Sequence, residues 1–160
     1  MYKRSGEELL LLLVHPGGPF WAKKDLGAWS IPKGQYDEGE EPLAAAKREF
    51  GEELGAPPSG EFWDLGTLVQ PGKKEIIAWA VEADFPVAEV KSNTFEMEWP
   101  PKSGKKRRFP EVDRAEWLTP ADARRKILPG QVEFIDRLLV RVGYVEPLQR
   151  QTTMPACAKP

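Results

Sequence analysis

The chain has 160 residues, with 23 Lys and Arg against 25 Asp and Glu, so its formal net charge is −2. A composition that is 41% hydrophobic and 30% charged is typical of one folded domain and too apolar for a disordered chain. The balanced charge also argues against a general nucleic-acid binder, which normally carries a basic excess. We expect a single domain over residues 1–146 and a C-terminal tail over residues 147–160, where structural signals are few.

Cysteine and histidine occur once each, as Cys157 and His15. This excludes an intramolecular disulfide, a thiolate zinc cluster and any metal site built from two imidazoles, and we expect His15 to be structural. The longest apolar run, Leu9 to Val14, is far shorter than the ~20 residues of a membrane-spanning helix, and no cleavage pattern of a signal peptide follows it. We therefore expect a cytoplasmic protein whose metal chemistry depends on carboxylates.

The first half of the chain predicts two strands and one helix. The run from Glu8 to Val14 is expected to be a buried strand, because it is short and a Pro-Gly-Gly-Pro breaker follows it closely. A second short strand is expected over residues 28–31. Apolar residues then recur at helical spacing from Pro42 to Leu54. Pro42 suits the first turn of a helix, and Gly55 suits its end.

The second half predicts further strands and then two closing helices. Its strand-like stretches are rich in Phe, Trp, Val and Ile and are separated by Pro-Gly or by a basic loop over residues 100–108. They cover residues 61–70, 74–83, 93–99 and 112–118, the first two as a hairpin. The helices are expected over residues 120–127 and 131–142. This order of elements predicts a mixed α/β (α+β) layered fold.

Three glutamates lie on one face of the first predicted helix. Glu49, Glu52 and Glu53 are spaced i, i+3 and i+4, with Arg48 beside them. Like charges at this spacing repel, so the helix needs a compensating cation, and ligation by oxygen alone favours Mg²⁺ or Mn²⁺. The alternative is a solvated acidic face in which Arg48 is an ordinary ion-pair partner.

The spacing around these acids is more specific than the acids alone. Gly34 is followed after five residues by Glu40, and after seven more by Arg48-Glu-Phe-Gly-Glu-Glu-Leu-Gly-Ala56. This pattern resembles the Nudix box, the signature of the Nudix hydrolases, at every fixed position. The resemblance implies a Nudix-type α/β/α sandwich with a mixed β-sheet, and cleavage of a phosphoanhydride bond in a nucleoside diphosphate linked to a further group X.

The resemblance also implies roles for the residues of the motif. Glu49, Glu52 and Glu53 would hold Mg²⁺, for which Mn²⁺ could substitute, and Gly34 would allow a close approach at the metal site. Arg48 and Glu40 would orient the carboxylates through ion pairs. Glu49, Glu52 and Arg48 are thereby counted among the catalytic residues.

The general base is less well defined, because the family takes it either from the motif or from a later loop. The later candidates are Glu96, Glu98 and Glu111. Glu111 is favoured because it begins a stretch that resembles the one where several Nudix enzymes place an additional metal-binding acid. The alternative for each of the three is an ordinary surface carboxylate.

Substrate-binding candidates lie outside the motif. Lys33 directly precedes it and could place an ammonium group on a phosphate, although a solvated lysine is the alternative. Trp29 and Trp99 are candidates for stacking on a base, and Glu98 is a further candidate in the substrate cleft. The basic run over residues 102–108 could hold a polyphosphate or RNA, or it could be a solvated loop tip.

Dinucleoside polyphosphates and nucleoside triphosphates are the leading expected substrates. One alternative is a Nudix-fold module that senses or binds nucleotides without hydrolysing them, but the acids of the motif are intact. An isomerase of prenyl diphosphates would use a catalytic cysteine, and Cys157 is poorly placed for that role. We expect a small-molecule nucleotide as the partner, with no membrane and no nucleic acid, and the oligomeric state, monomer or homodimer, stays open.

Overall fold

The computed structural model describes residues 1–70 and 73–146. The predicted tail over residues 147–160, Cys157 and the Pro71-Gly72 turn therefore lie outside the described residues. The strands are β1 Tyr2–Ser5, β2 Glu8–Pro16, β3 Phe62–Val69, β4 Glu75–Val81, β5 Thr94–Glu98, β6 Lys106–Pro110 and β7 Val112–Leu118. The helices are α1 Pro42–Leu54, α2 Pro120–Lys126 and α3 Val132–Arg141, with short 3-10 turns at Val87–Glu89 and Pro129–Gln131.

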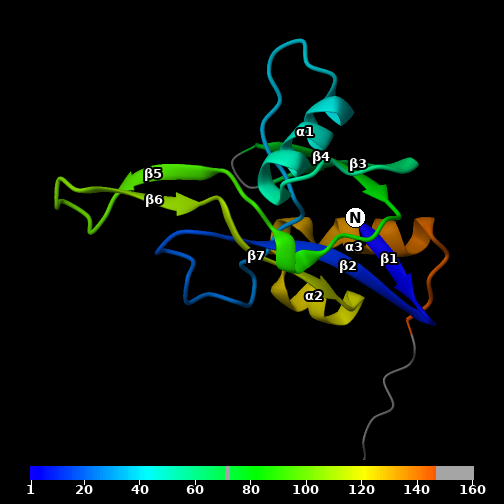
Figure 1. Ribbon diagram of the computed structural model, residues 1–160. Helices are drawn as coiled ribbons and strands as arrows, with labels where there is room; N and C mark the ends of the chain where they lie inside the picture. Colours follow the sequence, from blue (N-terminus) through cyan, green and yellow to red (C-terminus); the bar gives the residue numbers. More distant parts are fainter. Residues whose placement is uncertain (71–72, 147–160) are drawn as a thin grey trace, which may run out of the picture.

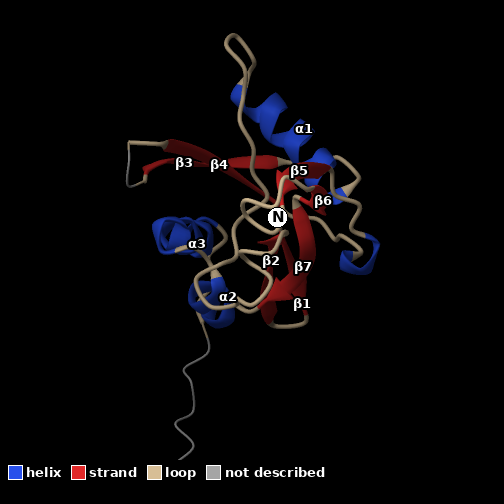
Figure 2. Ribbon diagram, turned by 90° about the vertical axis from the view of Figure 1, so that its left-hand side faces the viewer, coloured by secondary structure: helices blue, strands red, loops and turns tan. Residues whose placement is uncertain are grey.

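The centre of the fold is an antiparallel sheet in the order β1-β2-β7. Strand β2 is buried on both faces, because its alternate residues enter different cores. Leu9, Leu11 and Leu13 pack in the core that includes residues of α2 and α3, whereas Leu12 and Val14 pack in the core that includes residues of α1. Figures 1 and 2 show α1 on one side of these strands and α2 and α3 on the other. The predicted α/β/α sandwich is confirmed.

Two antiparallel hairpins complete the sheet structure. Hairpin β3–β4 contacts α1, and a parallel bridge between Tyr2 and Glu82 joins the end of β4 to β1, so both kinds of pairing occur. Hairpin β5–β6 projects from the body of the molecule (Figure 1). The base of this projecting hairpin adjoins the end of α1, because Asn93 N–H donates a hydrogen bond to Glu52 O at 3.0 Å.

Helix α1 begins and ends where the sequence predicts. Glu41 caps the first turn by accepting a hydrogen bond from Ala44 N–H at 2.8 Å, although glutamate is not among the preferred capping residues. Gly55 ends the helix with φ at 96°, a left-handed conformation that favours glycine. Phe50 and Leu54 are buried against the sheet, which leaves the acidic face of the helix turned away from this core.

The structure differs from the predicted elements in three segments. Strand β1 was not predicted, because in this polar edge strand only Tyr2 is buried. The basic segment expected as a loop over residues 100–108 contains the start of β6, whose charged residues pair with β5 instead of entering a core. The strand expected over residues 28–31 is reduced to isolated bridges from Trp29 to Ile127 and from Ser30 to Val14.

The burial of Phe50 gives a test of this packing. Its ring meets that of Phe85 edge-on, with ring centroids 5.9 Å apart. We expect Phe50→Ala to lower the free energy of unfolding by about 3 to 5 kcal/mol, because it leaves a cavity in the core. Val140→Ala on the exposed side of α3, where Val140 is 84% exposed, should change it by less than about 0.5 kcal/mol. Urea unfolding measures both, and equal effects would contradict the placement of Phe50.

Candidate active site

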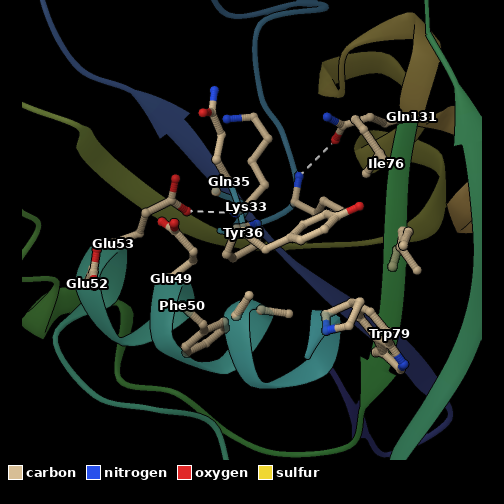
Figure 3. A pocket seen from close by; sticks show the side chains of 18 of the residues that line it. Lys33, Gln35, Tyr36, Glu49, Phe50, Glu52, Glu53, Ile76, Trp79 and Gln131 are labelled. Carbon is tan, nitrogen blue, oxygen red and sulfur yellow. Dashed lines mark hydrogen bonds between the residues drawn. The ribbon is translucent and has the colours of Figure 1, made fainter. Parts of the chain in front are cut away.

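A cavity of about 670 Å³ lies between α1, β4 and the loop over residues 31–36. Its lining has two chemically different ends, which Figure 3 shows on opposite sides of the view. Glu49, Glu52 and Glu53 of α1 form the acidic end, together with Lys33. The other end carries aromatic and aliphatic side chains. It is lined by Tyr36, Ile76, Trp79 and Gln131. The polar residues Gln70, Lys74 and Glu75 also line the cavity.

A series of three backbone hydrogen bonds places Glu111 beside the acidic end. Asn93 N–H donates to Glu52 O, Glu111 N–H donates to Asn93 O at 2.9 Å, and Gly17 N–H donates to Glu111 O at 2.9 Å. Glu111 thereby lines the same cavity as the glutamates of α1. The structure brings it together with the acids of the motif, although it lies more than fifty residues later in the chain.

Arg48 is the cation around which the acidic end is arranged. Its Nε and Nη2 donate to the two carboxylate oxygens of Glu40 at 3.0 and 3.1 Å, and its Nη1 donates to Glu49 at 3.0 Å and to Glu52 at 3.2 Å. These hydrogen bonds, first of all those to Glu40, raise the pKa of Arg48 above its usual value. The ion pairing that the resemblance implies for Arg48 and Glu40 is present.

Glu53 has a different environment from the other two glutamates. It is 7% exposed, and one of its oxygens accepts a hydrogen bond from the backbone N–H of Lys33 at 2.9 Å. The pKa of Glu53 is raised to about 7, mainly by burial and in addition by the charges of Glu111 and Glu49, whereas Lys33 acts in the opposite direction. A carboxylate that is costly to ionise in this way would gain much from a bound cation.

Gly34 lies directly against the carboxyl group of Glu49. A Cβ atom added at Gly34 would overlap the end of the Glu49 side chain. The loop can approach α1 this closely only without a side chain at position 34. Glycine is therefore needed here for a close approach to the carboxylate, in the place where the resemblance implies one.

The carboxylates do not converge on one point in this arrangement. Among residues 1–70 and 73–146, no three Asp, Glu, His or Cys side chains form a group that could hold a metal ion. Glu49 and Glu52 are turned toward Arg48, and Glu53 is turned toward Lys33 N–H. The donor set nevertheless fits a hard divalent cation, because it consists of carboxylate oxygens on one helix face, one of which lacks a charged hydrogen-bond partner in the described residues.

The structure corrects the expected position of Trp29. Its side chain is fully buried in the core, and its Nε1 donates to Asp25 at 2.8 Å, so it cannot stack on a substrate. The prediction failed because a tryptophan in a short strand-like run has the same sequence pattern whether it faces a cleft or a core. Lone His15 is fully buried too. Its Nδ1 lies 2.7 Å from Asp113 Oδ1 and its Nε2 lies 2.7 Å from Lys24 O, as expected of a structural residue.

Trp99 and Glu98 are on the projecting hairpin and do not line the cavity. Trp99 packs edge-on against Phe20, with ring centroids 5.4 Å apart, and Glu98 accepts a hydrogen bond from Gly104 N–H at 2.8 Å. Their expected place in the substrate cleft is therefore wrong for this cavity. Hairpin β5–β6 projects away from the body of the molecule (Figure 1), and the spacing of residues in the sequence does not reveal this direction.

The basic run over residues 102–108 lies at the tip and along β6 of the same hairpin and is exposed. Arg108 forms an ion pair with Glu96 at 2.9 Å across the two strands. This pairing accounts for Glu96 as well, since its carboxylate is engaged outside the cavity. Of the three later candidates for the general base, Glu111 is the one that lines the cavity.

Tyr36, Trp79 and Gln131 are among the cavity residues that were not predicted from the sequence. Tyr36 stands in a loop without periodic pattern, and Trp79 in a strand whose apolar pattern indicates only burial. Gln131 precedes α3 and is fully buried, which is unusual for glutamine. Of these three, only Tyr36 could have been suspected from the sequence. It follows Gly34 by two residues, so it belongs to the loop that approaches the acids of α1.

The raised pKa of Glu53 predicts how stability depends on pH without metal. The folded protein binds the proton of Glu53 more tightly than the unfolded chain does, with a pKa of about 7 against 4.5. The contribution of Glu53 to the free energy of unfolding is therefore largest below about pH 4.5, and it is lost as the pH rises through 7. Glu53→Gln removes the ionisable group and keeps an oxygen for Lys33 N–H. At pH 8 with a chelator, we expect it to be more stable than the wild type by roughly 2 to 3 kcal/mol, and at pH 4.5 to be equally stable.

Urea unfolding from pH 4.5 to 8.5 measures this difference. Glu52→Gln is the control, because the Glu52 carboxylate is 41% exposed and paired with Arg48, so its loss should cost less than about 1 kcal/mol at pH 8. A stability difference for Glu53→Gln that does not change with pH would show that Glu53 titrates normally.

Comparison with known proteins agrees with the fold and the motif. The model of the NUDIX domain family matches residues 1–138. No curated protein sequence matches the chain significantly. Within the described residues, no helix is both long and apolar enough to span a membrane.

Solved structures share the fold at low sequence identity. A C. elegans Ap4A hydrolase in a binary complex is 20% identical, with a TM-score of 0.62 over 89% of this chain and 93% of that one. The NUDIX domain of Shewanella oneidensis NrtR, complexed with ADP ribose, is 16% identical, with a TM-score of 0.61 over 88% and 82%. The C-terminal domain of mouse MUTYH, in complex with human PCNA, is 15% identical, with a TM-score of 0.55 over 91% and 87%.

The family model spans most of the chain and includes the whole acidic motif, from Gly34 to Ala56. The chain therefore belongs to the NUDIX domain family, and the acids of its motif are intact.

Proposed function

We propose that the protein uses Mg²⁺, for which Mn²⁺ can substitute, to hydrolyse a phosphoanhydride bond in a nucleoside diphosphate linked to X. The proposed substrates are a dinucleoside polyphosphate or a nucleoside triphosphate. The observation that carries the proposal is that one cavity has an acidic end and an aromatic end. Phosphates with their cation and a nucleobase can therefore bind in it at the same time.

The size of the cavity supports this proposal. Small-molecule sites typically have volumes of about 300 to 1,000 Å³, and this cavity is within that range. Its aromatic end provides the rings of Tyr36 and Trp79 for contact with a flat base. Lys33 adds a cation near the acidic end, where it can bind a phosphate oxygen.

When bound, the divalent ions neutralise charge on the phosphate oxygens and lower the pKa of the attacking water. Glu49, Glu52 and Glu53 hold them in the proposed site. Arg48 positions Glu49 and Glu52, because its Nη1 contacts both carboxylates. Gly34 leaves room for the Glu49 carboxyl group next to the loop.

Glu111 is the proposed general base. It is exposed to solvent and lines the cavity, and its charge contributes to the raised pKa of Glu53, which supports a position beside the acids of the motif. Glu96 and Glu98 are engaged on the projecting hairpin. The proton taken from water would reside on a Glu111 carboxylate oxygen until it returns to solvent.

Two of the structural neighbours support a nucleotide substrate with linked phosphates. One is named an Ap4A hydrolase, and the other was solved with ADP ribose. We further propose a single domain over residues 1–146, a small-molecule partner and a cytoplasmic location, as the lone cysteine favours. The alternative is a module that binds nucleotides without cleaving them.

Hydrolysis assays test the proposal. Purified protein with Mg²⁺ is incubated with nucleoside triphosphates, dinucleoside polyphosphates, nucleotide sugars and dinucleotide cofactors, and products are separated by chromatography. We expect selective cleavage of one class and a loss of more than about 100-fold in Glu53→Gln, since even residues that only orient metal ligands contribute about 10- to 100-fold. Glu98→Gln, outside the cavity, should keep its activity. Nucleotide binding without cleavage across the panel would instead support the binding module.

Gly34→Ala tests the close approach at Glu49. The added methyl group must displace the Glu49 carboxylate, which lies at the end of a flexible side chain, so we expect the fold to be retained and kcat to fall by roughly 100-fold. Gly51→Ala, on the helix that carries Glu49, is the control, because the atom nearest to its added methyl group would be Pro57 N at 3.4 Å. Circular dichroism and kcat measure the outcomes, and equal activity of the two variants would contradict this role of Gly34.

A further inference from the structure

Hairpin β3–β4 contains a bulge where its second strand lines the cavity. Asp64 pairs with Trp79, and the next pair is Gly66 with Ala78, so one residue of β3 has no partner in the ladder. Both β4 residues belong to the β4 wall, which we define as residues 75–79 that line the cavity. A bulge bends its strand and increases the local twist. The course of the β4 wall therefore depends on the bulge opposite it.

The bulge has its own local support within β3. Gly66 has a φ of 77°, in the left-handed region that favours glycine. Its backbone N–H donates a hydrogen bond to the carboxylate of Asp64 at 2.6 Å. These two features stabilise the shape of the bulge, but they do not fix its place relative to the rest of the fold.

Arg137 of α3 connects the bulge to the body of the protein. Its Nη1 donates to Leu65 O at 2.8 Å and to Thr67 O at 3.2 Å, the carbonyls on either side of Gly66. Its Nε and Nη2 donate to Glu133, one turn earlier on α3, at 3.1 and 2.7 Å. Because the guanidinium group is planar and bonded on both sides, it holds a fixed orientation between the helix and the strand.

The contact between Arg137 and the bulge is close. A Cβ atom added at Gly66 would lie 2.9 Å from Nη1 of Arg137, nearer than such atoms normally approach. The Arg137 side chain is 34% exposed, so most of it is enclosed. Arg137 thereby ties α3 to β3 at the level of Ala78, within the β4 wall.

We propose that Arg137 is a positioning residue for the substrate cavity. In this proposal, which rests on the proposed function, it acts through the bulge on the β4 wall and on Trp79, which Figure 3 shows at the aromatic end. Within the described residues, Arg137 is not part of the cavity lining. The acids lie on α1, where Arg48 orients Glu49 and Glu52 without any contribution from β3. Loss of Arg137 should therefore weaken nucleotide binding and leave the chemical step intact.

The first test compares two arginines of the same helix. Arg137→Met removes the donors to β3, and Arg141→Met is the matched control, because Arg141 contacts β3 by stacking on the Trp63 ring at 4.1 Å. The measured quantities are kcat and KM for the best substrate. We expect KM to rise about tenfold and kcat to stay within about twofold in Arg137→Met, whereas both should stay within about twofold in Arg141→Met.

The split between KM and kcat separates this role from a structural one. A change that only unfolds part of the protein lowers the apparent kcat and leaves KM unaltered, and that result would overturn the proposal. Because Arg137→Met could disturb folding, Asp64→Ala loosens the same bulge from its other side by removing the acceptor of Gly66 N–H. We expect it to raise KM as well, and an unaltered KM in Asp64→Ala would show that the bulge does not transmit the effect.

The second measurement follows the indole N–H of Trp79 by ¹⁵N NMR in the protein without ligand, with its resonance assigned from its loss in Trp79→Phe. We expect the resonance to shift in Arg137→Met and in Asp64→Ala. The indole resonance of Trp117, whose Nε1 donates to Phe85 O at 3.1 Å, is the internal control and should not shift. A Trp79 resonance at the wild-type position in both variants would contradict the role of Arg137.

The failure of this proposal can be told apart from the failure of the proposed function. The NMR comparison needs neither ligand nor hydrolysis, and titration with nucleoside monophosphates measures the dissociation constant of each variant directly. If the protein cleaves none of the panel but the Trp79 resonance shifts and binding weakens in Arg137→Met, only the hydrolytic function is contradicted. If the protein cleaves its substrate and binding is equal in wild type and Arg137→Met, only the role of Arg137 is contradicted.

Discussion

The electrostatics of one helix face constrain the rest of this structure. Glu49, Glu52 and Glu53 lie within two turns of α1, and they repel each other unless cations approach them. Arg48 supplies part of the compensating positive charge by contacting Glu49 and Glu52, and Glu40 holds the guanidinium group in place. Glu53 receives only a backbone N–H, and burial makes its ionisation costly. The folded chain thus contains a carboxyl group whose ionised form it stabilises poorly, and a bound cation would supply that stabilisation.

The double-sided core explains how α1 can carry such a face. Because β2 is apolar on both sides, α1 packs Phe50 and Leu54 into one of the two cores, and its acids lie beside these residues, with Glu53 buried and Glu52 exposed to solvent. The same sheet places α2 and α3 on its other side, and the turn between them brings Gln131 to the far end of the cavity. The lining of the cavity therefore comes from different layers of the fold.

The sequence was informative where residues act through local spacing. The limits of α1, the pairing of Arg48 with Glu40 and the need for glycine at position 34 follow from one continuous motif, and the apolar run of β2 predicts burial on two faces. The cavity beyond the motif depends on long-range contacts. Whether Trp29 faces a core, whether Glu98 projects into solvent, and whether Tyr36 and Gln131 line the same cavity are decided by long-range packing that no local period encodes. Glu111 was the exception, because it was placed by likeness to the family.

The backbone bonds that connect Glu52, Asn93, Glu111 and Gly17 have a consequence for the variability of this chain. Since every bond in the series uses main-chain atoms, it does not depend on the identity of the side chains at these points. Asn93 and Glu111 are bonded to each other at the base of the projecting hairpin, and the loop at its tip lies at the far end of the two strands between them. Residues can be inserted or lost there without changing the register at Glu111, so related chains could differ in the length of this arm while the acids keep their mutual positions.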